Sequence, residues 1–138
     1  MRFTRITIIR IRKPDIEQNK EHSVNSELQF LGESLGLFNE RDKDKSCFRI
    51  FIVMLKALKN GHHLTSDEIA ERTNLTRGTV IHHLTRLMES GIVVSQKNYY
   101  MLAVDNMEEL VDLVKSNLVK TFDNLKPVAR SIDKKLEL

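Results

Sequence analysis

The sequence predicts a mainly α-helical fold with a small β component (α+β), and three observations lead to this prediction. Apolar residues recur at three- and four-residue spacing over several long stretches, which is the period of an amphipathic helix. The chain has 138 residues with only 2 Pro and 5 Gly, so few positions interrupt a helix. Between residues 64 and 95, two short helical patterns are followed by a glycine and β-branched residues. This order is typical of a winged helix-turn-helix, in which a β-hairpin follows two helices.

Residues 1–41 are predicted to form an N-terminal extension. Residues 2–12 are rich in β-branched side chains and roughly alternate, which predicts a β-strand that ends before Pro14. A polar linker over 15–26 and a short helix over 26–35 are expected to follow. Because an unpaired strand is an aggregation hazard, we expect this strand to pair with the wing sheet or with a second copy. The strand and its end are basic, with Arg2, Arg5, Arg10, Arg12 and Lys13.

Residues 42–103 are predicted to form the winged helix-turn-helix domain. Its supporting helix is expected to be capped by Asp44 or Ser46, because both side chains can accept a backbone hydrogen bond. The next helix follows Thr65, and Glu68 three residues later predicts a capping box.

The second helix of the motif is predicted to begin at Arg77, because Thr76 can cap it. Gly91 is expected to end this helix in the left-handed conformation that favours glycine. The wing would then consist of two strands, Ile92–Ser95 and Tyr99–Ala103, joined by a three-residue turn. The apolar residues of this helix recur at helical spacing and predict its buried stripe: Val80, Leu84, Leu87 and Met88.

The segment TRGTVIHHLTRLMESGIVV resembles the recognition helix and first wing strand of ArsR-like winged-helix transcriptional regulators. The resemblance covers residues 45–103 and implies a homodimer that binds operator DNA. The chain lacks the Cys-x-Cys pair of the metal-sensing members, and its single cysteine is Cys47. We therefore expect no metal and no cofactor, and the sequence indicates no particular small-molecule effector. The matching residues are Thr79, Val80, His83, Leu84, Leu87, Gly91, Ile92 and Val93.

The polar face of the predicted recognition helix is the candidate DNA-binding site. Arg77 is expected to recognise a base, since arginine can donate two parallel hydrogen bonds to guanine, or else to contact phosphate. Arg86 is expected at phosphate, and Lys97 at the wing tip either contacts DNA or only solubilises the turn. His82 is interpreted as a DNA contact rather than a solvated histidine, whereas His83 is interpreted as a packed histidine that bonds backbone or phosphate. The full candidate set is Thr76, Arg77, Thr79, His82, His83, Arg86 and Lys97.

Residues 104–138 are predicted to form one long C-terminal helix. Asp105 and Glu108 have the spacing of a capping box at its start. Pro127 is expected to kink this helix or to split it in two, because proline removes a backbone donor. The apolar positions of its first part are Met107, Val111, Val114 and Leu118.

The second part of this helix carries a seam whose apolar residues alternate steps of four and three, as in a coiled coil. The seam could pack within the chain or against another hydrophobic partner. Dimerisation is the favoured interpretation, because one small winged domain offers little surface to cover it. The predicted dimerisation residues are Leu118, Phe122, Leu125, Ala129, Ile132 and Leu136.

Composition restricts the class of protein. The formal net charge is +3 and the pI is about 9.1, which suits a nucleic-acid partner. One cysteine excludes an internal disulfide and fits a reducing, cytoplasmic location. No run approaches the roughly 20 apolar residues of a membrane span, so no membrane partner is expected.

The function predicted from the sequence is that of a sequence-specific DNA-binding transcriptional regulator acting as a homodimer, with double-stranded DNA as its partner. No nucleophile elbow, phosphate-binding glycine loop, metal-ligand cluster or apolar pair of carboxylates is present, so an enzyme is not expected. Two alternatives remain open. One is an architectural or replication-associated DNA-binding protein, and the other is a winged-helix adaptor for protein interactions.

Overall fold

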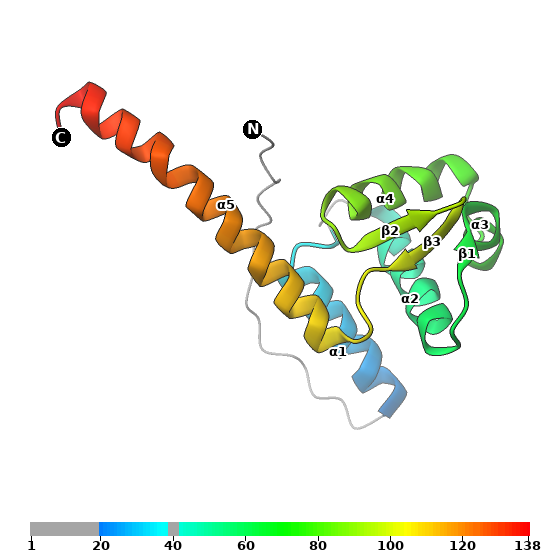
Figure 1. Cartoon of the computed structure of the whole chain (residues 1–138). Coiled ribbons are helices and arrows are strands. Elements are labelled where there is room, and N and C mark those ends of the chain that lie inside the picture. The colour runs from blue at the N-terminus through cyan, green and yellow to red at the C-terminus, as the bar shows by residue number, and fades with distance from the viewer. Residues whose placement is uncertain (1–19, 39–41) are drawn as a thin grey trace.

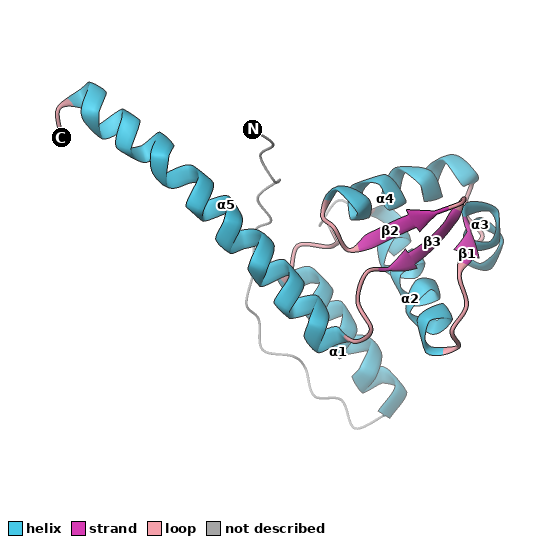
Figure 2. Ribbon diagram, in the orientation of Figure 1, coloured by secondary structure: helices cyan, strands magenta, loops and turns pink. Residues whose placement is uncertain are grey.

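A computed structural model describes residues 20–38 and 42–138, and the strand predicted over residues 2–12 lies outside them. Five helices and a small sheet form a winged helix-turn-helix from which one long helix extends (Figures 1 and 2). The predicted fold class and the long C-terminal helix are confirmed. The elements are α1 (Lys20–Ser34), a 3-10 turn (Lys43–Lys45), α2 (Ser46–Lys59), β1 (Leu64–Thr65), α3 (Ser66–Thr73), α4 (Arg77–Glu89), β2 (Val93–Gln96), β3 (Tyr99–Leu102) and α5 (Met107–Leu136).

The sheet has three antiparallel strands in the order β1-β3-β2, with β3 in the centre. The short strand β1 was not predicted from the sequence, and it places Leu64 opposite Tyr100. The wing hairpin closes more tightly than predicted, because Gln96 still pairs with Tyr99. Its turn is therefore the two-residue segment Lys97-Asn98, and both residues have positive φ (50° and 67°). Positive φ at both central positions is the requirement of a type I′ turn.

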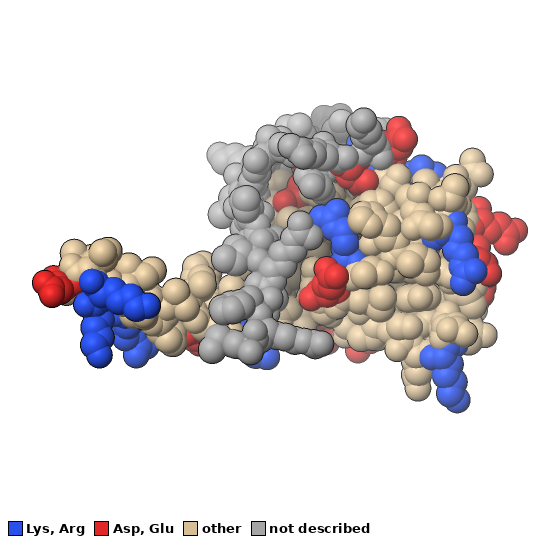
Figure 3. Space-filling model, turned by 90° about the horizontal axis from the view of Figure 1, so that it is seen from above, with Lys and Arg blue, Asp and Glu red and all other residues tan. Residues whose placement is uncertain are grey.

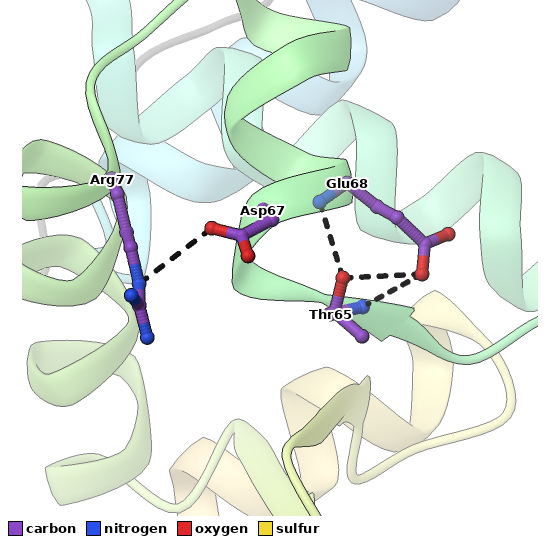
Figure 4. A network of polar contacts seen from close by, with 4 residues as sticks. All are labelled: Thr65, Asp67, Glu68 and Arg77. Carbon is purple, nitrogen blue, oxygen red and sulfur yellow. Dashed lines mark hydrogen bonds and ion pairs between the residues drawn. The ribbon is translucent and has the colours of Figure 1, made fainter.

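The local signals of the helix-turn-helix are confirmed. The Thr65 hydroxyl accepts the Glu68 N–H at 3.2 Å, and the Glu68 carboxylate accepts the Thr65 N–H at 3.4 Å, which completes the capping box (Figure 4). The Thr76 hydroxyl caps α4 by accepting the Thr79 N–H at 3.2 Å. Gly91 follows α4 with φ of 77°, which is the left-handed conformation in which a glycine commonly ends a helix.

Two predictions for the preceding helices are wrong. The first helix begins at Lys20, so the expected linker over 15–26 is in part helical. Neither Asp44 nor Ser46 caps α2; the Asp42 carboxylate does so, accepting the Cys47 N–H with oxygens at 3.1 and 3.3 Å. The Asp42 carboxylate lies on the other side of the 3-10 turn from α2. Lys45, the residue before α2, is left-handed with φ of 54°, and this conformation brings the chain back toward Asp42.

The start of α5 also differs by one residue from the prediction. Asn106, rather than Asp105, is the N-cap, and its side chain accepts the Glu109 N–H at 2.8 Å. The second bond of the pair is made by Glu109, rather than Glu108: its carboxylate accepts the Asp105 N–H at 2.8 Å. The reciprocal pattern is that of a capping box, moved one position along the chain.

The helix α5 runs through Pro127 as one element of 30 residues, or about 45 Å, so the predicted split is wrong. Pro127 deprives the Asp123 carbonyl of its helical donor. Both residues are exposed, so water can satisfy that carbonyl. In Figure 1, the C-terminal part of α5 projects away from the winged domain, and α1 lies near its N-terminal part.

The core lies between α2, α3, α4 and the sheet, and both α1 and α5 add to it. Leu35 contributes from the turn after α1, and Leu110 and Val114 contribute from α5. The predicted stripe of α5 is wrong at Val111, which is 39% exposed, because Leu110 is the residue that faces the core. The largest fully buried side chains are Phe51, Ile50, Leu64, Ile69, Leu84, Ile92, Leu110, Val80 and Val93.

Candidate nucleic-acid interface

The helix α4 presents a continuous face to solvent. Val80, Leu84 and Leu87 are buried, and they anchor α4 against α3 and β2. Since successive residues turn by about 100°, the opposite side of α4 is fixed by this stripe. Figure 3 views the molecule from above, where Lys and Arg side chains are scattered over the winged domain and acidic side chains lie both among them and at one edge. The residues opposite the stripe are Gly78, His82, Thr85 and Glu89, and all four are exposed.

The predicted DNA-binding residues of α4 do not all share this outward face. His82 lies on it and is exposed. Arg77 is exposed at one flank, at the start of the helix, while Thr79 and Arg86 are half-buried at the other flank. Two residues of the face, Gly78 and Thr85, were not named from the sequence. The buried stripe alone would have identified them, because it specifies the opposite side of the helix.

The first turn of α4 is held by its two threonines. The hydroxyl oxygens of Thr76 and Thr79 lie 2.9 Å apart, and the Thr76 hydroxyl also accepts the Thr79 N–H. Thr76 is exposed and Thr79 is half-buried. A helix N-terminus carries partial positive charge and N–H donors, which favour a phosphate group nearby.

Arg77 contacts an acidic side chain of the neighbouring helix. Its Nε lies 3.6 Å from Oδ1 of Asp67 on α3, and both side chains are largely exposed, at 71% and 77% (Figure 4). Asp67 was not predicted from the sequence to belong to the site, because the two residues meet only when α3 and α4 pack together.

The two adjacent histidines occupy different environments. Their rings meet edge to face with centroids 5.5 Å apart, but His82 is exposed and His83 is half-buried. Burial lowers the pKa of His83 below its ordinary value of 6.5, and the positive charges of His82 and Arg86 lower it further, while Asp42 opposes them. His83 therefore favours the neutral form, in agreement with a packed histidine.

The wing tip is a second basic element of the candidate interface. Lys97 is exposed at the turn between β2 and β3, and Tyr99 beside it is 45% exposed. The left-handed conformation of Lys97 (φ 50°) directs the chain through the turn without help from glycine. An aromatic ring and a lysine at one hairpin tip suit contact with a nucleic-acid backbone or groove.

Two hydrogen bonds tie the helix-turn-helix to the rest of the fold. The Arg49 guanidinium on α2 donates to the Thr73 carbonyl at the end of α3. The Asn117 amide on α5 donates to the Ser90 carbonyl at 3.1 Å, immediately after α4. The ends of both motif helices are thus fixed by neighbouring elements, and α5 is linked directly to the recognition helix.

Outside α4, the described side chains of Cys47, His62 and His63 are not gathered into a metal site. Cys47 is buried, and burial raises the pKa of its thiol to about 12, with a further contribution from Asp42. His62 and His63 are exposed beyond the end of α2. Within residues 20–38 and 42–138, no group of three or more His, Cys, Asp or Glu could hold a metal ion. In the same part of the chain, no helix is both long and apolar enough to cross a membrane.

The predicted dimerisation seam lies along α5. The buried residues of this helix, Leu110, Val114 and Thr121, all belong to its first half. In the second half, apolar side chains are exposed in the single chain, including Phe122 at 59% and Ile132 at 50%. Of the other seam residues, Leu118 and Leu125 are half-buried, and Ala129 and Leu136 are exposed.

The wing hairpin paired into the sheet and the outward-facing α4 define a winged helix-turn-helix of the DNA-binding class. Comparison with protein families agrees with this class. The model described as "Bacterial regulatory protein, arsR family" matches residues 52–95, from α2 through most of β2. The resemblance to ArsR-like regulators is thereby confirmed for this segment, and it supports a DNA-binding transcriptional regulator with double-stranded DNA as partner. A search of curated proteins found no match.

Proposed function

We propose that the protein is a sequence-specific transcriptional regulator that binds double-stranded DNA as a homodimer. The observation that carries this proposal is the outward face of α4. The opposite side of this helix is packed into the core through its buried stripe, and Thr76 caps its N-terminus. The matched family segment covers this helix completely.

In the proposed complex, α4 enters the major groove, which is about 12 Å wide and admits a helix. Arg77, Thr79 and His82 would contact base edges, and these contacts would provide sequence preference. Phosphates would be contacted by Thr76, His83 and Arg86 on α4, by Lys97 on the wing and by the basic residues before Pro14. Such phosphate contacts release counterions, so affinity should fall steeply with salt.

The proposed dimer interface is the second half of α5. Its apolar residues share one face, because they follow one another by steps of four and three. Charges of both signs flank this face, which suits pairing of two identical helices. A second copy would cover the face and hold two recognition helices at a fixed spacing. The flanking charges are Lys120, Asp123, Lys126, Arg130 and Asp133.

The dimer is tested by placing a charge in the seam. Because Ile132 is 50% exposed in the single chain, Ile132→Glu should leave the winged domain folded. In a dimer the same glutamate would be buried without a partner, and the effective cost of burying one unpaired ion in a protein is several kcal/mol. Ser131→Glu adds the same charge at an exposed position on another side of the helix.

Sedimentation should show a shift to monomer for Ile132→Glu and an unchanged dimer for Ser131→Glu. Circular dichroism should report the same helical content for both. DNA affinity should fall strongly only for Ile132→Glu, since two half-sites are no longer bound together. A dimer that persists in Ile132→Glu with undiminished affinity would rule out α5 as the interface.

A further inference from the structure

We propose that Asp67 is a positioning residue for base recognition. From the first turn of α3 it orients the guanidinium of Arg77, so that the two terminal nitrogens of Arg77 are directed to the edge of a guanine. This inference rests on the proposed DNA binding by α4, and it assigns a role to a residue outside the recognition helix.

The geometry of the pair carries the inference. Oδ1 of Asp67 lies 3.6 Å from Nε of Arg77, the first residue of α4. The backbone of Asp67 lies in the first turn of α3, which the capping box between Thr65 and Glu68 holds on either side of it. Figure 4 shows the Arg77 side chain extended from the start of α4 past Asp67, with its terminal nitrogens beyond the contact.

The chemistry of the guanidinium explains why this contact selects an orientation. Arginine has five N–H donors in a planar fork, and the Asp67 carboxylate forms an ion pair with Nε at a distance longer than a hydrogen bond. The two terminal nitrogens then remain available as a parallel pair, which is the pair that can bind O6 and N7 of guanine. A carboxylate ion-paired with the inner nitrogen favours one orientation of the fork, so less freedom is lost when the base is bound.

The pair has little value for the fold itself. Both side chains are more than two thirds exposed, and an ion pair in that setting contributes little to stability. A carboxylate close to DNA also repels phosphate, so Asp67 should reduce affinity for DNA in general. Specificity is the difference between the affinity for the correct site and the affinity for other DNA. Asp67 would increase this difference, because it weakens binding to DNA in general and orients a side chain that contacts a base.

The expected signature of Asp67→Ala is therefore a pair of opposite changes. Preference for guanine at the base pair contacted by Arg77 should fall by about two- to fivefold, the range that corresponds to an exposed ion pair. Affinity for duplexes without the site should rise, because a negative charge is removed. Glu71→Ala is the matched control: Glu71 is an exposed acid one turn further along α3, and its loss should raise general affinity without changing base preference.

The experiment uses the intact chain. A library of DNA duplexes with a randomised central segment is enriched on the wild-type protein, and the selected duplex is then varied at each base pair. Competition titrations compare wild type, Asp67→Ala, Glu71→Ala, Arg77→Ala and the double variant of Asp67 and Arg77. If Asp67 acts through Arg77, Asp67→Ala should have no further effect on base preference once Arg77 is alanine.

The outcomes separate this inference from the proposed function. If Arg77→Ala abolishes preference at one base pair while Asp67→Ala leaves it unchanged, the positioning role is overturned and base recognition by Arg77 stands. If Arg77→Ala changes preference at no base pair, base recognition by Arg77 fails and the positioning role fails with it. An equal loss of affinity for all duplexes in Asp67→Ala would indicate a structural role and would also overturn the inference.

Discussion

Gly78→Ala should make the protein more stable and at the same time weaken its DNA binding. Gly78 is the second residue of α4, on the outward face, and a Cβ built there meets nothing within 4 Å. Its φ is not positive, so alanine fits the backbone without strain. Replacing glycine by alanine at a compatible site stabilises a protein by about 0.4–1 kcal/mol, mainly by restricting the unfolded chain. Nothing within the described fold therefore calls for glycine at this position.

A close approach of DNA to the first turn of α4 would call for glycine there. An added methyl group between two surfaces in contact costs about 1–3 kcal/mol, which corresponds to roughly five- to 150-fold in affinity. Denaturant unfolding should show the gain in stability, and titration with the selected duplex should show the loss of affinity. Ser131→Ala is the control, because it improves helix propensity at an exposed site far along α5 and should leave binding unchanged. Unchanged or tighter binding by Gly78→Ala would refute the placement of this turn against DNA.

Substitutions at Lys97, His83 and Gly32 test the wing tip, the half-buried histidine and the packing after α1. Lys97→Asn removes one positive charge, and asparagine tolerates the left-handed conformation of this turn position. The slope of log affinity against log salt should become shallower by about 0.9. An unchanged slope would mean that Lys97 contacts no phosphate. Because the pKa of His83 is lowered in the folded protein, the unfolded chain binds the proton more readily, and stability should decrease as pH falls through about 6.5. Chemical denaturation at several pH values should show a weaker decrease for His83→Gln, and an identical decrease would contradict this reasoning. Gly32→Ala would place a Cβ 1.8 Å from the buried Phe38 ring, so thermal unfolding should show a loss of about 1–3 kcal/mol, whereas unchanged stability would contradict this packing.

Features determined by neighbouring residues in the sequence were predictable. The caps at Thr65 and Thr76 and the stop at Gly91 depend on side chains within a few positions, and all three are confirmed. The order of helices and wing strands follows from periodicity in the same way. The start of α5 shows the limit of this local information, since Asp105 and Asn106 are both good caps and the choice between them depends on how the chain leaves β3.

Features that require two distant segments to meet were not predictable from pattern alone. The strand β1 has only two residues, and it exists because Leu64 is buried beside β3. The contact between Asp67 and Arg77 depends on the angle between α3 and α4. No pattern in the sequence indicates that these two residues are neighbours. Pro127 is tolerated in α5 because its surroundings are exposed, which the sequence pattern of the helix did not indicate.

Sequence-specific binding by a two-fold dimer can be measured by selection from the randomised duplex library with the intact wild-type chain. We expect the recovered sequences to share an inverted repeat whose half-sites lie about one helical turn apart, roughly 10 base pairs between centres. Recovery without any shared sequence, despite affinity that falls steeply with salt, would indicate an architectural DNA-binding protein instead. If no duplex is bound even at low salt, the protein does not act through DNA, and the function as an adaptor for protein interactions is left.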